Sequence, residues 1–319
     1  MKVAVRSFAK INLGLRIGAL RADGYHELRT AYQTVGLHDV IRVELKRGSG
    51  IEIRCDDPRV PKDESNTCYR IAELALAALK VRGRVVVEIE KRLPVQGGLG
   101  GASGNAVSAL LAVERAAKKI LPDEERLRLA AEVGSDLPLF LVGGTVLGVG
   151  RGEEVYPLPD LPSMACVIAT PEIGISTPKA FADWDRAKLT DADTSDRMVR
   201  FGRAISAWLS ELQRFHSGVP ASGRGRAETP LLDLVRTGIE NDFEKVVFPQ
   251  YPELSMVKSA LERTGALYAS LSGSGSATYG LFRDTKAARD AAEKLRKSGI
   301  PAVATATLAR SQYWKRIFG

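Results

Sequence analysis

LPVQGGLGGASGNA, residues 93–106, is the stretch around which the rest of the chain can be arranged. The β-branched run at 84–90 before it predicts a strand, and the run after it, up to about residue 121, has the apolar spacing of a helix. The predicted buried face of that helix holds Ala106, Leu110, Val113, Ala117 and Ile120. Glycines between a strand and a helix let a phosphate approach backbone N–H groups at the positive end of the helix dipole. The stretch is therefore typical of a phosphate-binding loop, with a flexible turn as the alternative.

Two common phosphate-loop motifs do not occur in this sequence. A GxxxxGK[ST] loop needs a Gly-Lys pair, which the chain lacks, and no GxGxxG spacing fits residues 97–104. A second glycine-rich run, LSGSGS at 271–276 within LSGSGSATYGLF (271–282), precedes an alternating strand and by itself predicts only a tight turn.

Upstream of the glycines, residues 3–17 alternate between apolar and polar positions, as in a strand with one buried face. Lys10 and Asn12 share the opposite face, where a lysine taken alone usually faces solvent. Tyr25 and His26 lie in a turn, where taken alone the pattern is compatible with surface residues and a lone histidine does not indicate a site. Further on, Ser65 and Asn66 offer a cap for a helix over 69–81.

Downstream, a predicted helix over 123–133 ends at Gly134, and Asp136 before Leu-Pro taken alone is typical of a helix cap. A proline cluster predicts a domain boundary near residue 158. Beyond it the pattern predicts strands at 164–170 and 300–308, helices within 178–215 and at about 251–264 and 285–298, and a mobile loop without an assigned role at 217–227. This order predicts an α+β architecture and not a strict βαβ array.

The composition is that of an ordinary globular protein. The 319 residues are 45% hydrophobic and 26% charged, which at about 150 residues per domain suggests two domains. No run approaches the roughly 18 apolar residues of a membrane span, and the start of the chain lacks the apolar core of a signal peptide. Three scattered cysteines predict reduced thiols. With no HExxH or CxxC spacing, a structural zinc site is not expected. We therefore expect a cytoplasmic protein without a membrane partner.

The charge balance favours anionic partners. Lys and Arg number 46 against 38 Asp and Glu, a net charge of +8. The basic residues are dispersed, and no aromatic residues are interleaved with them in a stripe. Small phosphorylated substrates are therefore favoured over nucleic acid.

Five stretches, taken in order, resemble the GHMP kinases, the superfamily of galactokinase, homoserine kinase, mevalonate kinase and phosphomevalonate kinase. These are AKINLGL (9–15), RADGYH (21–26), LPVQGGLGGASGNA (93–106), GSDLPLF (134–140) and LSGSGSA (271–277). The resemblance implies an α+β fold of two domains with the active site in the cleft between them. An N-terminal domain like ribosomal protein S5 would span 1–158. A ferredoxin-like sandwich would span 159–319, with its last residues packing back on the first domain.

Within the superfamily, the first, second and fourth stretches resemble members that act on a cytidylyl alcohol. The implied reaction is ATP-dependent phosphorylation of the 2-hydroxyl of a methylerythritol unit, joined to cytidine by a diphosphate, in the non-mevalonate isoprenoid pathway. The implied cofactors are ATP and Mg²⁺, with the metal carried by ATP near Ser103 and no permanent protein ligands. A monomer or weak homodimer is expected.

The resemblance also assigns roles to individual residues. It implies that Lys10 and Asp136 are catalytic, with Asp136 as base and Lys10 as charge stabiliser. It places the cytosine between Tyr25, His26 and Phe181, and the erythritol end beside Asn12 and Thr177. The implied ATP-binding residues are Asn66, Pro94, Val95, Gln96, Gly97, Gly98, Leu99, Gly100, Gly101, Ala102, Ser103 and Gly104. The chain departs from the superfamily at Gly104, where a second serine usually follows Ser103.

Two other functions stay open at this point. One is a GHMP kinase for homoserine or a mevalonate-type alcohol; the RADGYH turn and Phe181 argue against it, because those substrates have no base to stack. The other is an RNA-binding module, since the N-terminal architecture also occurs in ribosomal and translation proteins. Salt-sensitive RNA binding without ATP hydrolysis would favour that second function.

Overall fold

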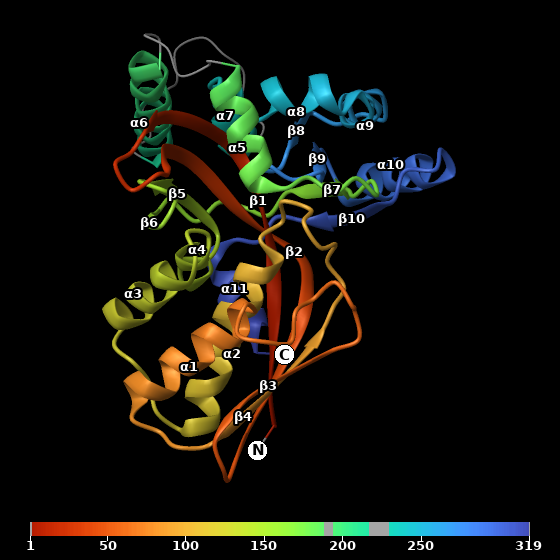
Figure 1. Ribbon diagram of the computed structural model, residues 1–319. Coiled ribbons are helices and arrows are strands. Elements are labelled where there is room, and N and C mark those ends of the chain that lie inside the picture. The colour runs from red at the N-terminus through yellow and green to blue at the C-terminus, as the bar shows by residue number, and fades with distance from the viewer. Residues whose placement is uncertain (1, 188–193, 217–229, 319) are drawn as a thin grey trace.

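The computed structural model describes residues 2–187, 194–216 and 230–318 (Figure 1). The loop predicted at 217–227 lies outside these residues. The described strands form two sheets, and both ends of the described chain lie in the lower part of Figure 1, beside the first sheet.

The first sheet carries helices on one face. Its strands are β1 (Lys2–Leu20), β2 (His26–Lys46), β3 (Gly50–Cys55), β4 (Arg84–Glu90), β5 (Thr145–Val149) and β6 (Glu154–Pro157). They run in the order β3-β4-β2-β5-β6, and β1 pairs antiparallel with β2 over almost its whole length. The helices are α1 (Thr67–Leu79), α2 (Gly101–Ala117), α3 (Asp123–Val133) and α4 (Leu137–Val142). Apolar side chains of β1 to β4 and of these helices share one core.

The second sheet is antiparallel, in the order β10-β7-β9-β8. Its strands are β7 (Ala165–Ala169), β8 (Tyr268–Leu271), β9 (Thr278–Phe282) and β10 (Ala302–Ala306). Around it lie α5 (Thr177–Arg186), α6 (Thr194–His216), α7 (Pro230–Arg236), α8 (Glu244–Gln250), α9 (Pro252–Arg263) and α10 (Thr285–Lys297). One face of the sheet packs on α9 and α10, and the other packs on α6, α7 and the β1–β2 hairpin.

The β1–β2 hairpin runs through both halves of the molecule. Val3 and Val5 lie in the core of the first sheet, whereas Ile11 and Leu13 pack against the second. Farther along, Ile17 packs against residues of α5 and α8. Every residue from 7 to 15 is therefore buried, on both faces of the strand. At residues 2–6 buried and open positions alternate as expected, but over residues 7–15 the expectation of an open face is wrong, because alternation in a sequence records only the apolar face.

A final helix, α11 (Arg310–Ile317), returns to the first sheet. The Tyr313 hydroxyl donates to the carbonyl of Phe140 (2.7 Å), and the Leu308 amide donates to the carbonyl of Thr34 (2.8 Å). The domain boundary predicted near residue 158 falls in the segment between β6 and β7. It stays a prediction, because β1 contributes residues both to the core of the first sheet and to that of the second.

Most long elements match the sequence pattern. The strand at 84–90 and the helix at 123–133 have the predicted bounds, and the Asn66 side chain caps α1 by accepting from the Cys68 amide (2.8 Å). Ile120 is a correction: α2 ends at Ala117, so this residue lies beyond the helix and is 78% exposed. Among the described helices, none is long and apolar enough to cross a membrane.

Candidate active site

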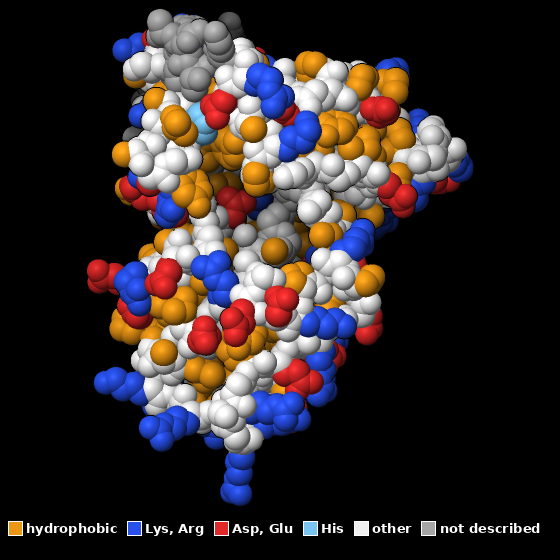
Figure 2. Space-filling model, viewed as in Figure 1, with side chains coloured by type: hydrophobic (Ala, Val, Ile, Leu, Met, Phe, Trp, Pro, Cys, Tyr) orange, Lys and Arg blue, Asp and Glu red, His pale blue; other side chains and the backbone are white. Residues whose placement is uncertain are grey.

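A cavity of about 880 Å³ lies between the two sheets, where the surface is hollowed in Figure 2. Residues from both halves of the chain line it. From the sequence-predicted set these are Lys10, Asn12, Tyr25, His26, Asn66, Pro94, Val95, Gln96, Gly97, Gly98, Leu99, Gly100, Gly101, Ala102, Ser103, Asp136, Thr177 and Phe181. The fold thus gathers distant motifs around one space.

The glycine-rich loop leads into α2 along one side of the cavity. Gly100 precedes the helix in the left-handed conformation (φ 68°), and no side chain caps the first turn. The N–H groups of residues 101–103 are therefore free of capping partners and available to an anion. The second glycine loop holds this one in place, because Ser272 Oγ donates to the carbonyl of Gly98 and the Ala277 amide donates to that of Gly97 (both 3.0 Å).

Lys10 and Asp136 meet in the cavity although they are far apart in the sequence. Lys10 Nζ lies 3.4 Å from Asp136 Oδ2, with 4% of the lysine side chain and 35% of the aspartate side chain exposed. Lys10 also donates to Asn12 Oδ1 (2.6 Å), and Asn12 Nδ2 donates to Thr30 Oγ1 (2.8 Å). Asp136 occupies the N-cap position of α4, but its side chain makes no capping bond. The carboxylate is instead held by Lys10 and stays accessible from the cavity.

Tyr32 orients the Asp136 carboxylate. Its hydroxyl donates to Asp136 Oδ1 (3.1 Å). Burial, and secondly the negative charge of Asp136, raise the pKa of the Tyr32 phenol well above its usual range, so the phenol stays protonated and donates. Sequence analysis missed this residue. The signal was the pairing register, which puts Tyr32 opposite Asn12 once β2 is seen to begin at His26, the last residue of the RADGYH stretch.

Aromatic side chains line the far end of the cavity. His26 and Phe181 stack with ring centroids 5.4 Å apart and planes 7° apart, and Phe243 meets Phe181 edge-on. His26 Nδ1 donates to the carbonyl of Gly18 (3.0 Å), since a carbonyl oxygen only accepts. Tyr25 is 53% exposed, and the guanidinium of Arg151 lies 4.9 Å from its ring.

Two charged residues at this end were not predicted. Asp185 places Oδ1 3.0 Å from His26 Nε2, without the geometry of a hydrogen bond, and Arg151 lines the cavity beside Tyr25. Neither belongs to one of the five stretches, so only the folded chain brings them to the site.

Gly104 alone among the predicted ATP-binding residues is not part of the cavity lining. It packs against β1, where a Cβ atom would lie 2.9 Å from Ser7 Oγ and 3.0 Å from the carbonyl oxygen of Phe8. The missing second serine therefore has a steric reason, because α2 approaches β1 too closely for a side chain at this position.

Replacing Gly104 with alanine should destabilise the protein. Inside a helix this change normally adds roughly 0.5–1 kcal/mol to the free energy of unfolding, but overpacking against the backbone costs about 1–3 kcal/mol. We expect a net loss of ~1–2 kcal/mol in urea denaturation. Gly202→Ala is the control, because its Cβ meets only the flexible end of Arg29. A Gly104→Ala variant more stable than the wild type would contradict the packing argument.

Known proteins share this fold. The chain matches the profile described as GHMP kinases N terminal domain at residues 66–144 and the one described as GHMP kinases C terminal at 228–301. A solved structure of homoserine kinase from Cytophaga hutchinsonii, 20% identical, has a TM-score of 0.69 over 97% of this chain and 95% of that one. The fold is thus that of the GHMP class of kinases, which confirms the resemblance and the α+β architecture expected from the motifs.

More similar relatives specify the family. A 4-diphosphocytidyl-2-C-methyl-D-erythritol kinase of Solibacter usitatus is 36% identical over 91% of this chain and 84% of that protein. One from Desulfitobacterium hafniense is 34% identical over 98% of each. A crystal structure of 4-(cytidine 5'-diphospho)-2C-methyl-D-erythritol kinase, 30% identical, has a TM-score of 0.71 and covers 95% of this chain and 98% of that one. The chain belongs to the 4-diphosphocytidyl-2-C-methyl-D-erythritol kinase family.

Proposed function

We propose that the chain transfers the γ-phosphoryl group of ATP to the 2-hydroxyl of 4-diphosphocytidyl-2-C-methyl-D-erythritol. The products are the 2-phosphate and ADP, in the non-mevalonate route to isoprenoid precursors. The observation that carries the proposal is the pair of Lys10 and Asp136, 3.4 Å apart in a cavity that has the glycine loop on one side and aromatic rings at the far end. Relatives named for this activity support the choice of substrate.

Asp136 acts as the base in this proposal. A base must lie within hydrogen-bond reach of the acceptor hydroxyl, and this carboxylate is both accessible from the cavity and fixed by Tyr32. Lys10 is buried with its charge beside the same point, where it offsets the negative charge that develops on the transferred group. The phosphates of ATP lie along residues 97–103, and Asn66 lines the same cavity for the adenine.

Magnesium fits the oxygen donors of this site. Mg²⁺ in kinases is usually held by one or two protein oxygens together with substrate phosphates, and the Ser103 hydroxyl and the Asp136 carboxylate both line the cavity. Among the described residues, no group of three or more His, Cys, Asp or Glu side chains could hold a metal by itself. We therefore propose that Mg²⁺ comes with ATP and neutralises its phosphates.

The substrate is tested by ADP release with Mg-ATP and three alcohols in parallel. We expect turnover with 4-diphosphocytidyl-2-C-methyl-D-erythritol, and kcat/KM at least ~1,000-fold lower with homoserine or mevalonate, because neither fills the aromatic end. Turnover with one of these alcohols alone would retain the kinase chemistry and reject the base-binding roles of Tyr25, His26 and Phe181. Absence of ADP with all three would reject the proposed activity.

The partners follow from the same chemistry. We propose that the chain acts in the cytoplasm on small molecules, without a nucleic-acid or membrane partner, as a monomer or weak homodimer. Light scattering across a range of protein concentrations tests the oligomeric state. Salt-sensitive RNA binding in place of ATP turnover would instead favour the RNA-binding alternative.

A further inference from the structure

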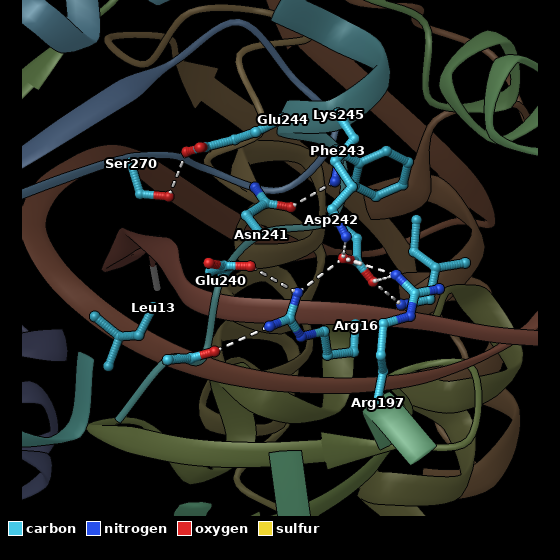
Figure 3. A network of polar contacts seen from close by, with 12 residues as sticks. Leu13, Arg16, Arg197, Glu240, Asn241, Asp242, Phe243, Glu244, Lys245 and Ser270 are labelled. Atoms are coloured by element: carbon cyan, nitrogen blue, oxygen red, sulfur yellow. Dashed lines mark hydrogen bonds and ion pairs between the residues drawn. The ribbon is translucent and has the colours of Figure 1, made fainter. Parts of the chain in front are cut away.

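Residues 240–245 lie between β1, the strand that carries Lys10 and Asn12, and the second glycine loop. Figure 3 shows this segment beside Arg16 of β1 and beside Ser270, which precedes the loop. Its backbone pairs with β1, since the Leu15 amide donates to the carbonyl of Glu240 (2.9 Å) and the Asp242 amide donates to that of Leu15 (2.8 Å). This contact lies on the strand that carries Lys10 and Asn12. The 240–245 segment is therefore fixed relative to the catalytic lysine.

Asp242 anchors the segment with a fully buried carboxylate. The carboxylate accepts from the Ile17 amide (3.0 Å), from Arg16 Nη1 (2.9 Å) and from Lys245 Nζ (2.9 Å), while Arg197 Nη1 lies 3.4 Å away. A buried carboxylate with several charged donors holds its surroundings in one geometry, because any displacement leaves a buried charge uncompensated. The neighbouring Asn241 is thus held rigidly.

Asn241 uses its side chain to hold the second glycine loop. It is 2% exposed, and its Nδ2 donates to the carbonyls of Leu271 and Gly273 (both 2.9 Å). Its Oδ1 accepts from the Phe243 amide (3.1 Å). Because Nδ2 faces two carbonyl acceptors and Oδ1 faces an N–H donor, the side-chain amide of Asn241 has a single orientation.

The loop that Asn241 holds touches both parts of the proposed catalytic machinery. A Cβ on Gly273 would lie 3.0 Å from Asn12 Oδ1 and 3.4 Å from Lys10 Nζ, so its backbone lies directly against this pair. One residue earlier, Ser272 bonds to Gly98 of the phosphate loop. A shift of the loop therefore displaces Lys10 and the ATP phosphates relative to each other.

We propose that Asn241 is a positioning residue for phosphoryl transfer, which it controls by fixing residues 271–273 between Lys10 and the phosphate loop. The inference rests on the proposed kinase activity. Asn241 aligns ATP with the Lys10 ammonium group and contacts neither substrate. Misalignment of reacting groups by about 1 Å costs on the order of 100-fold in rate.

Asn241→Asp is the sharpest test, because it keeps the oxygen that accepts from Phe243 and replaces the two donors with an oxygen facing two carbonyls. We expect kcat to fall about 10- to 100-fold and KM for ATP to rise about tenfold. The KM for the cytidylyl alcohol should change less than about threefold, because Tyr25, His26 and Phe181 keep their supports. Ser270→Ala is the matched control. It removes a hydroxyl that donates to Glu244 (2.8 Å) and, at 3.4 Å, to the Leu271 carbonyl, but it leaves both hydrogen bonds from Asn241 in place, and it should leave both KM values unchanged.

Separate measurement of KM and kcat distinguishes a positioning role from a simple loss of folded protein. A variant that is merely destabilised loses active enzyme with both KM values unchanged, and that outcome would overturn the inference, as would Asn241→Asp kinetics within twofold of wild type. The dissociation constant of a fluorescent ATP analogue, measured without the alcohol, provides an independent readout that should also weaken about tenfold. If the wild type binds the analogue but turns over no alcohol, the proposed function fails while this binding comparison still decides the role of Asn241.

Discussion

Asp136→Asn should lower kcat by about 100- to 10,000-fold while ATP binding is retained. The amide has nearly the shape of the carboxylate and still accepts from Tyr32, so the site should keep its geometry. It has no basic oxygen to take the proton of the acceptor hydroxyl. The phosphate loop is held by the second glycine loop and not by Asp136, which is why the ATP affinity should persist. The measurements are kcat from ADP release and the dissociation constant of an ATP analogue.

Asp185→Asn is the control for this change. Asp185 also lines the cavity, but at the aromatic end beside His26. Its amide variant should raise KM for the cytidylyl alcohol and leave kcat within a few-fold of wild type. Turnover of Asp136→Asn within tenfold of wild type would exclude Asp136 as the base and leave it, at most, an orienting group.

Lys10→Met should lower kcat/KM by about 100- to 1,000-fold. Methionine fills most of the lysine's volume but removes the positive charge beside Asp136, and this charge is effective because the side chain is 4% exposed and poorly screened by water. The change also leaves Asn12 Oδ1 without its donor, so urea denaturation should accompany the kinetics to show how much protein stays folded.

Lys2→Met is the matched control for the loss of a lysine from the same strand. Lys2 lies at the start of β1, where its side chain is 51% exposed and paired with Glu88, far from the cavity. Exposed pairs of this kind contribute roughly 0–1 kcal/mol, so activity should be unchanged. An unchanged rate for folded Lys10→Met would remove Lys10 from the mechanism.

The local parts of the site could be predicted from the sequence alone. The strand at 84–90, the glycines and the helix after them form a contiguous unit, so their pattern indicates a phosphate loop. Alternation likewise predicts that Lys10 and Asn12 share a face, and their side chains are hydrogen-bonded. The pairing of Lys10 with Asp136 came from the family resemblance, since no periodicity connects residues so far apart.

The remaining parts depend on tertiary contacts. Tyr32 was missed because β2 is much longer than its apolar pattern suggests, and Asn241 because its partners are backbone carbonyls 30 and 32 residues away. Ile120 was misplaced because the helical pattern continues past the point at which α2 ends, with Lys118 in a left-handed conformation. For Tyr32 and Asn241 the deciding interaction is non-local and leaves no mark on the spacing of residues, whereas α2 ends at a local cap, where the Lys118 N–H donates to the carbonyls of Glu114 and Arg115.

The hairpin shared by both cores determines when the protein can fold during its synthesis. The Leu15 amide and carbonyl bond to Glu240 and Asp242, and the Thr34 carbonyl accepts from Leu308 near the end of the chain. At translation rates of about 5–20 residues per second, residue 240 follows residue 15 by on the order of 10–45 s. For that interval Ile11 and Leu13, on the strand that carries Lys10, lack the residues of the second sheet and of α6 and α7 that cover them in the folded protein. The cavity is therefore completed late, once the second half of the chain has emerged from the ribosome.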